Sequence, residues 1–115
     1  MLPLERIRNA LLARRRELFE QVAHVEDDLR WLDVHVAAET EEEGQEENIA
    51  RLLARLDERG KAEIDAIDRA MIRIANGDYG YCTDCGEGIA PARLEVQPTT
   101  ALCRACAEKR EGRAT

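Results

Sequence analysis

Apolar residues recur at helical spacing along the first two thirds of the chain. Between positions 11 and 36 they lie three, four or seven residues apart, and a second set between 49 and 74 is spaced similarly. This is the period of an α-helix with one apolar stripe. Two long helices are therefore predicted, and their stripes consist of Leu11, Leu18, Val22, Val25, Leu29, Leu32 and Val36, then Ile49, Leu53, Leu56, Ile64, Ile67, Met71 and Ile74.

The two stripes fit one antiparallel coiled coil. Antiparallel partners have residue numbers that add to a constant, and here that constant is 85, as for Leu18 and Ile67. The midpoint predicts a turn at Glu42 and Glu43, at the end of arms that reach about 45 Å at a rise of about 1.5 Å per residue. Gly60 interrupts the second stripe and marks either a local bend or a close approach of the two helices.

The predicted tip is strongly acidic. Residues 39–47 contain six glutamates and no basic residue, and they account for six of the seven units of net negative charge. Two local patterns compete to define the turn. Thr40 to Glu43 has the spacing of a capping box and would start the second helix at Glu41, whereas Gly44 would instead close the first helix as a C-cap.

Composition changes once along the chain. Ala, Leu, Glu and Arg dominate up to Asn76, and Gly, Pro, Thr and Cys gather after it, so we expect a coiled-coil hairpin over 1–76 and a small module over 77–115. The start lacks a signal-peptide core and no apolar run is long enough to span a membrane, which favours a cytoplasmic protein. An acidic chain without a basic domain disfavours direct binding to DNA or to an anionic membrane.

The strongest chemical signal is a pair of Cys-x-x-Cys motifs. Cys82 and Cys85 are followed by seventeen residues and then by Cys103 and Cys106. This spacing is typical of a tetrahedral zinc site, and four thiolates leave no open position for water or substrate. We therefore predict one structural Zn²⁺. Gly86 supplies the backbone freedom that a tight turn beside the metal needs, and a short helix begins at the second pair.

No other cluster suggests catalysis. A nucleophile with a histidine and an acid is not apparent in the sequence, so an enzyme is not predicted. Trp31, the only tryptophan, has two interpretations: an exposed anchor for a partner, or a shield over the helix seam.

The hairpin, the segments ANGDYGYCTDCGEGI and ARLEVQPTTALCRAC, and the short terminal helix together resemble the DksA/TraR family of C4-type zinc-finger transcription regulators. The resemblance implies a mainly α protein whose coiled coil enters the secondary channel of RNA polymerase and modulates initiation. It also implies that the four cysteines bind zinc. The acidic tip motif of the family aligns with Glu39, Glu42 and Gly44, where glutamates replace both aspartates and glycine replaces an alanine.

The resemblance also bears on regulation. Basic positions that some members use with guanosine tetraphosphate align with Ala66, Gln97 and Ala107, which predicts polymerase binding with weak or no alarmone synergy. A seam that is complete within one hairpin predicts a monomer. The alternative is a zinc-stapled coiled-coil adaptor that binds another protein and has no polymerase activity.

Overall fold

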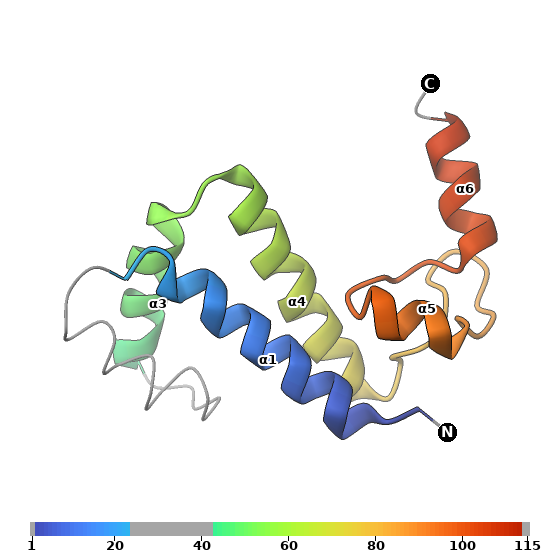
Figure 1. The fold of residues 1–115 in the computed structure, drawn as a ribbon, viewed down its shortest axis with the longest axis horizontal. Helices are drawn as coiled ribbons and strands as arrows, with labels where there is room; N and C mark the ends of the chain where they lie inside the picture. The colour runs from blue at the N-terminus through green and yellow to red at the C-terminus, as the bar shows by residue number, and fades with distance from the viewer. Residues whose placement is uncertain (1, 24–42, 114–115) are drawn as a thin grey trace. The chain divides into compact units, whose positions relative to one another are not determined.

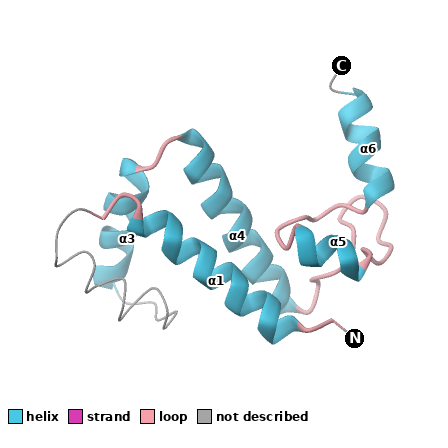
Figure 2. Ribbon diagram, in the orientation of Figure 1, coloured by secondary structure: helices cyan, strands magenta, loops and turns pink. Residues whose placement is uncertain are grey.

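The computed structural model describes residues 2–23 and 43–113, and within these ranges it is built from helices (Figure 1). The helices are α1 (Leu4–Glu20), α3 (Glu43–Arg55), α4 (Glu58–Asn76), α5 (Pro91–Val96) and α6 (Arg104–Arg113). In the described ranges the only β-pairing is an isolated bridge between Tyr81 and Gly88, so Figure 2 shows helices and loops without a strand. The prediction of a mainly helical protein is confirmed. None of the described helices combines the length and apolar character that crossing a membrane requires.

The chain divides into two compact units. The first combines Met1–Arg8 with Asp68–Thr115, and the second is Asn9–Ile67. The ends of α1 and α4 thus belong with the cysteine-containing segment, whereas the remainder of both helices packs with α3.

The second unit contains the predicted antiparallel helix pair. In it α1 and α4 run side by side in opposite directions (Figure 1), and the guanidinium of Arg14 donates two hydrogen bonds to the carboxylate of Glu63. Beyond the end of α1, Arg55 at the end of α3 donates to the carbonyl of Val22 at 3.2 Å. The antiparallel arrangement expected from the apolar stripes is therefore confirmed. The buried core of this unit consists of Leu11, Leu18, Phe19, Leu52, Leu56, Ile64 and Ile67.

The second arm of the pair is broken. The helix α3 ends at Arg55 and α4 begins at Glu58, so the arm is two helices joined at Leu56 and Asp57. Asp57 caps α4, because its Oδ1 accepts a hydrogen bond from the backbone N–H of Gly60 at 2.8 Å. In the first arm, α1 ends at Glu20 and residues 21–22 form a turn. Neither arm is therefore one continuous helix over the residues that the structure describes, 2–23 and 43–113.

Gly60 packs against the turn between α3 and α4, within the second arm. It is buried, and a Cβ at this position would lie 3.1 Å from Cδ2 of Leu56 and 3.3 Å from Oδ1 of Asp57. The missing side chain leaves room for the turn that precedes α4. Of the two expectations for Gly60, the local bend is closer to the structure.

The register of the pair differs from the expected one. Arg14 with Glu63, and Val22 with Arg55, have numbers that add to 77 rather than 85. Apolar periodicity determines which face of each helix is buried, but it does not determine how far one helix is shifted along the other. Gly44 lies in the first turn of α3, so the alternative in which it closes the first helix as a C-cap is wrong. Glu42, half of the predicted turn, lies outside the described residues.

The first unit has its own small core. Its buried apolar residues are Ile7 of α1, Ala70 of α4, and Tyr79, Ile89 and Leu94 of the following segment. Cys82 and Cys106 are buried beside them. The helices α1 and α4 thus contribute apolar side chains to the unit that carries the cysteines.

Candidate metal centre

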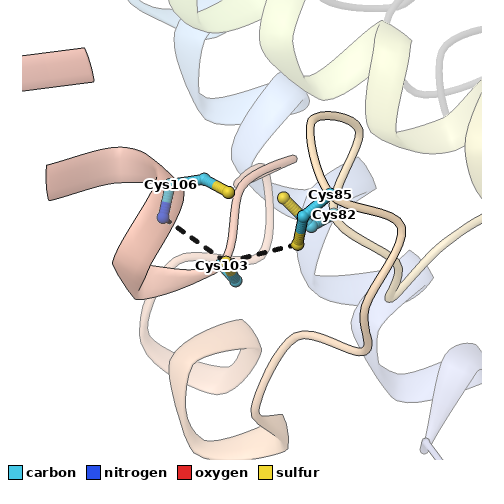
Figure 3. Close-up of side chains that lie close together, drawn as sticks. All are labelled: Cys82, Cys85, Cys103 and Cys106. Atoms are coloured by element: carbon cyan, nitrogen blue, oxygen red, sulfur yellow. Dashed lines mark hydrogen bonds between the residues drawn. The ribbon is translucent and has the colours of Figure 1, made fainter. Parts of the chain in front are cut away.

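The structure brings the four predicted cysteines together. Cys82 and Cys85 lie on the loop between α4 and α5, Cys103 directly precedes α6, and Cys106 is in the first turn of α6 (Figure 3). Their side chains point toward one another, and all four sulfur atoms lie within 4.8 Å of each other. The segment between the pairs folds back as the spacing predicted.

The first pair lies on a tight backbone turn, which we call the first knuckle (residues 82–87). The N–H of Cys82 donates to the carbonyl of Glu87 at 2.8 Å, and the N–H of Gly86 donates to the carbonyl of Cys82 at 2.9 Å. Gly86 has a φ of 78°, a conformation that residues with a side chain rarely adopt. The predicted need for glycine after Cys85 is confirmed.

Backbone bonds hold the second pair against this knuckle. The N–H of Thr83 donates to the carbonyl of Ala101 at 2.9 Å, which fixes the approach of the segment that leads to Cys103. The N–H of Cys106 points at the sulfur of Cys103 at 3.5 Å, as Figure 3 shows. Backbone N–H groups that face a sulfur atom favour its thiolate form.

The sulfur positions fit a tetrahedral zinc ion. Zn–S bonds of about 2.3 Å at tetrahedral angles place neighbouring sulfurs about 3.8 Å apart. The sulfurs of Cys85 and Cys103 are 3.8 Å apart. A disulfide would need about 2.05 Å, and all four cysteines are free thiols. The donor set, its spacing and its geometry therefore fit one structural Zn²⁺ held by Cys82, Cys85, Cys103 and Cys106.

The acidities of the thiols also favour a bound cation. Backbone hydrogen bonds, led by that of Cys103, lower the pKa of Cys82 to about 6. Neighbouring sulfurs, with Cys103 first, raise the pKa of Cys106 to about 12. So many sulfurs at this distance cannot all ionise beside one another, and a divalent cation removes the conflict by pairing with every thiolate.

Side chains that the sequence analysis did not single out support the loop between the pairs. The hydroxyl of Tyr79 donates to the carbonyl of Pro98 at 2.8 Å, and Arg73 of α4 donates to the carbonyl of Thr99 at 3.3 Å. Arg93 of α5 donates to the carbonyl of Leu102, next to Cys103, at 3.0 Å. A tyrosine or arginine that bonds distant carbonyls has no spacing signal in the sequence, so these contacts emerge from the tertiary structure alone.

Of the other predicted site residues, the structure describes only one. Gly44 is in the first turn of α3, whereas Glu39, Glu42 and Trp31 lie outside the described residues. Their predicted roles at the tip and in partner contact stay predictions.

Comparison with known proteins extends these findings beyond the cysteines. Residues 77–112 match the family model described as the prokaryotic dksA/traR C4-type zinc finger. Over 114 residues the chain is 32% identical to the RNA polymerase-binding transcription factor DksA of Caulobacter vibrioides, which covers 96% of this chain and 77% of that protein. It is 33% identical over 103 residues to the Escherichia coli protein of the same name, which covers 90% of this chain and 63% of that protein.

A solved structure is similar as well. The transcription factor DksA2 from Pseudomonas aeruginosa matches with a TM-score of 0.63 and 34% identity, over 96% of this chain and 84% of that one. The similarity therefore includes the helical segments as well as the cysteine cluster.

Proposed function

This chain belongs to the DksA/TraR C4-type zinc-finger family, and we propose from that membership that it is a transcription regulator that binds RNA polymerase directly. The observation that carries the proposal is similarity over 96% of the chain to a relative named for polymerase binding. A match confined to the zinc finger would support a metal site alone. The family is one of transcription factors, so no catalytic reaction is assigned to the chain.

The proposed mechanism uses the acidic segment 39–47 as a probe inserted through the secondary channel of the polymerase. Its six glutamates carry a concentrated negative charge. Carboxylate oxygens are hard ligands that divalent ions prefer, so a cluster near the catalytic magnesium would compete for or reorient the groups around it. Glu39, Glu42 and Gly44 are the proposed contact residues, and Trp31 is a proposed partner contact.

The zinc-binding unit would fix the base of the probe. Zinc supplies a structural cross-link between the two cysteine pairs when it is bound. Tyr79 and Arg73 tie the loop between the pairs to the end of α4, and so connect the metal-bound segment to a helix of the antiparallel pair. The proposed functional division is between residues 1–76, which carry the acidic probe, and residues 77–115, which dock outside the channel.

Four further properties belong to the proposal. The chain acts as a cytoplasmic monomer. It does not bind DNA directly, because its net negative charge is repelled by the phosphate backbone. Guanosine tetraphosphate adds little to its action, since Ala66, Gln97 and Ala107 offer no cation for a phosphate. An assay in which the alarmone increased inhibition severalfold would overturn this last point.

The experiment that tests the function is direct binding to purified core RNA polymerase, followed by transcription in vitro. Glu39→Ala and Glu42→Ala remove the proposed contact carboxylates, and Glu5→Ala is the matched control at an exposed glutamate in the first turn of α1. We expect all three variants to bind the polymerase, and only the two tip variants to lose regulation. Absence of binding by the unaltered protein would overturn the proposal and favour the zinc-stapled adaptor.

A further inference from the structure

The helix α6 has almost no apolar anchorage. Cys106 is its one buried residue among the side chains that the structure describes. Seven of the others are exposed: Arg104, Ala105, Glu108, Lys109, Arg110, Glu111 and Gly112. A helix that buries no stripe cannot be oriented by packing, so its direction must be set by polar or metal-mediated contacts.

One such contact lies a full turn beyond the metal ligands. Arg110 Nε donates to Oδ2 of Asp84 at 2.8 Å, and Nη2 donates to Oδ1 at 2.5 Å. Asp84 is inside the first knuckle, between Cys82 and Cys85. Two parallel bonds between a planar guanidinium and a carboxylate fix an orientation as well as a distance.

We infer that Arg110 is a positioning residue, which fixes the direction of α6 on the first knuckle and makes that direction depend on the bound metal. Cys103 and Cys106 attach the start of α6 to the metal site, but both lie at its first turn and leave the rest of the helix free to swing. The bond from Arg110 to Asp84 adds an attachment one turn further along the helix. Because Cys82 and Cys85 position Asp84 through the metal, loss of zinc would release both attachments together.

Exposed ion pairs are usually weak, and the geometry distinguishes this one. The side chains of Arg110 and Asp84 are 59% and 33% exposed, so their hydrogen bonds add little to the free energy of folding. Their effect is on the orientation of α6. Arg104 and Glu108 form a pair at 3.2 Å that lies wholly within α6. That pair cannot orient the helix relative to anything else, which makes it a matched control. The inference goes beyond the proposed function and does not depend on which protein the chain binds.

The test is the order of α6 in solution, measured on the full zinc-loaded chain. At 13.0 kDa the protein suits backbone amide relaxation and residual dipolar couplings by NMR. In the unaltered protein we expect amides 107–112 to share the alignment of the first knuckle. In Arg110→Gln and Asp84→Asn we expect their order parameters to fall from about 0.85 to about 0.6 or below. The Arg104→Gln control should keep them.

Two additional variants sharpen the interpretation. Arg110→Lys retains the charge but loses the two-bond geometry, so it should restore little of the order. The exchange Asp84→Arg with Arg110→Asp should restore most of it. Unchanged order in Arg110→Gln, or equal loss in Arg104→Gln, would overturn the inference. Loss of zinc from Arg110→Gln, measured as metal content per chain, would also overturn it, because the pair would then serve the metal site itself.

Discussion

Replacing Asp57 with alanine tests the break in the second arm. Asp57 is the residue before α4, and its Oδ1 satisfies the N–H of Gly60, which has no partner within the helix. Alanine cannot accept that bond. The substitution leaves the apolar core untouched, so its effect reports on the cap.

The magnitude follows from general values for helix caps. Loss of an N-cap side chain costs about 1 kcal/mol in the free energy of unfolding. With about 2.1 cal/mol/K of unfolding entropy per residue, a unit of roughly 60 residues has about 0.12 kcal/mol/K. If Asn9–Ile67 unfolds by itself, the midpoint should fall by about 8 °C. If the whole chain unfolds as one, the entropy is about twice as large and the fall is about 4 °C.

The assay is thermal and urea unfolding followed by far-UV circular dichroism. Asp57→Asn is the control, because asparagine is as good an N-cap and should remain close to the unaltered protein. A loss below about 0.3 kcal/mol in Asp57→Ala would refute the reasoning, since it would mean that the second arm does not need a cap at this position. An equal loss in Asp57→Asn would implicate the charge instead of the hydrogen bond.

Two further outcomes concern the metal site and the helix pair. Zinc binding near neutral pH should release one proton from Cys85, whose pKa is raised by desolvation and then by the sulfur of Cys82, and one from Cys106, whose pKa neighbouring sulfurs raise. An indicator dye in weak buffer measures this release, and binding without it would contradict the thiolate site. Glu63→Gln should lose about 0.5 kcal/mol of stability at neutral pH. The hydrogen bonds from Arg14 lower the pKa of Glu63 from its ordinary 4.5, so this contribution is fully present above that value and is lost as the pH falls through the lower, folded pKa. Urea midpoints of the two proteins should therefore converge in acid, and a constant difference across pH would show that the carboxylate charge is irrelevant.

The metal ligands were predictable because their information is local. Two short Cys-x-x-Cys motifs each position a pair of sulfurs, and the chain between them needs only to fold back. The support around the site was not predictable in the same way. Asp84 and Arg110 are 26 residues apart, and Tyr79 reaches a carbonyl 19 residues away, without a repeating pattern that would link them.

The helical arms were predicted in kind but not in length. The apolar stripe continues across Leu56 and Ile64, so periodicity alone reads it as one helix. The break had a signal: Asp57 stands three residues before Gly60, with acidic Glu58 opening the first turn. The stripe also omitted Phe19 and Leu52, which are fully buried, because turns after Glu20 and Arg55 alter which faces meet.

The sequence by itself determined the helical class, the antiparallel pairing and the zinc ligands, because periodicity and ligand spacing act over a few residues. Tertiary structure decided where the helices break and which residues of the two arms meet, with residue numbers that add to 77. It also decided that the ends of α1 and α4 belong to the cysteine-containing unit. It also decided that Arg110 meets Asp84. The helix breaks, the register and the bond between Arg110 and Asp84 depend on contacts between residues that are distant in the sequence. Such contacts form only when the chain folds, so no local pattern records them.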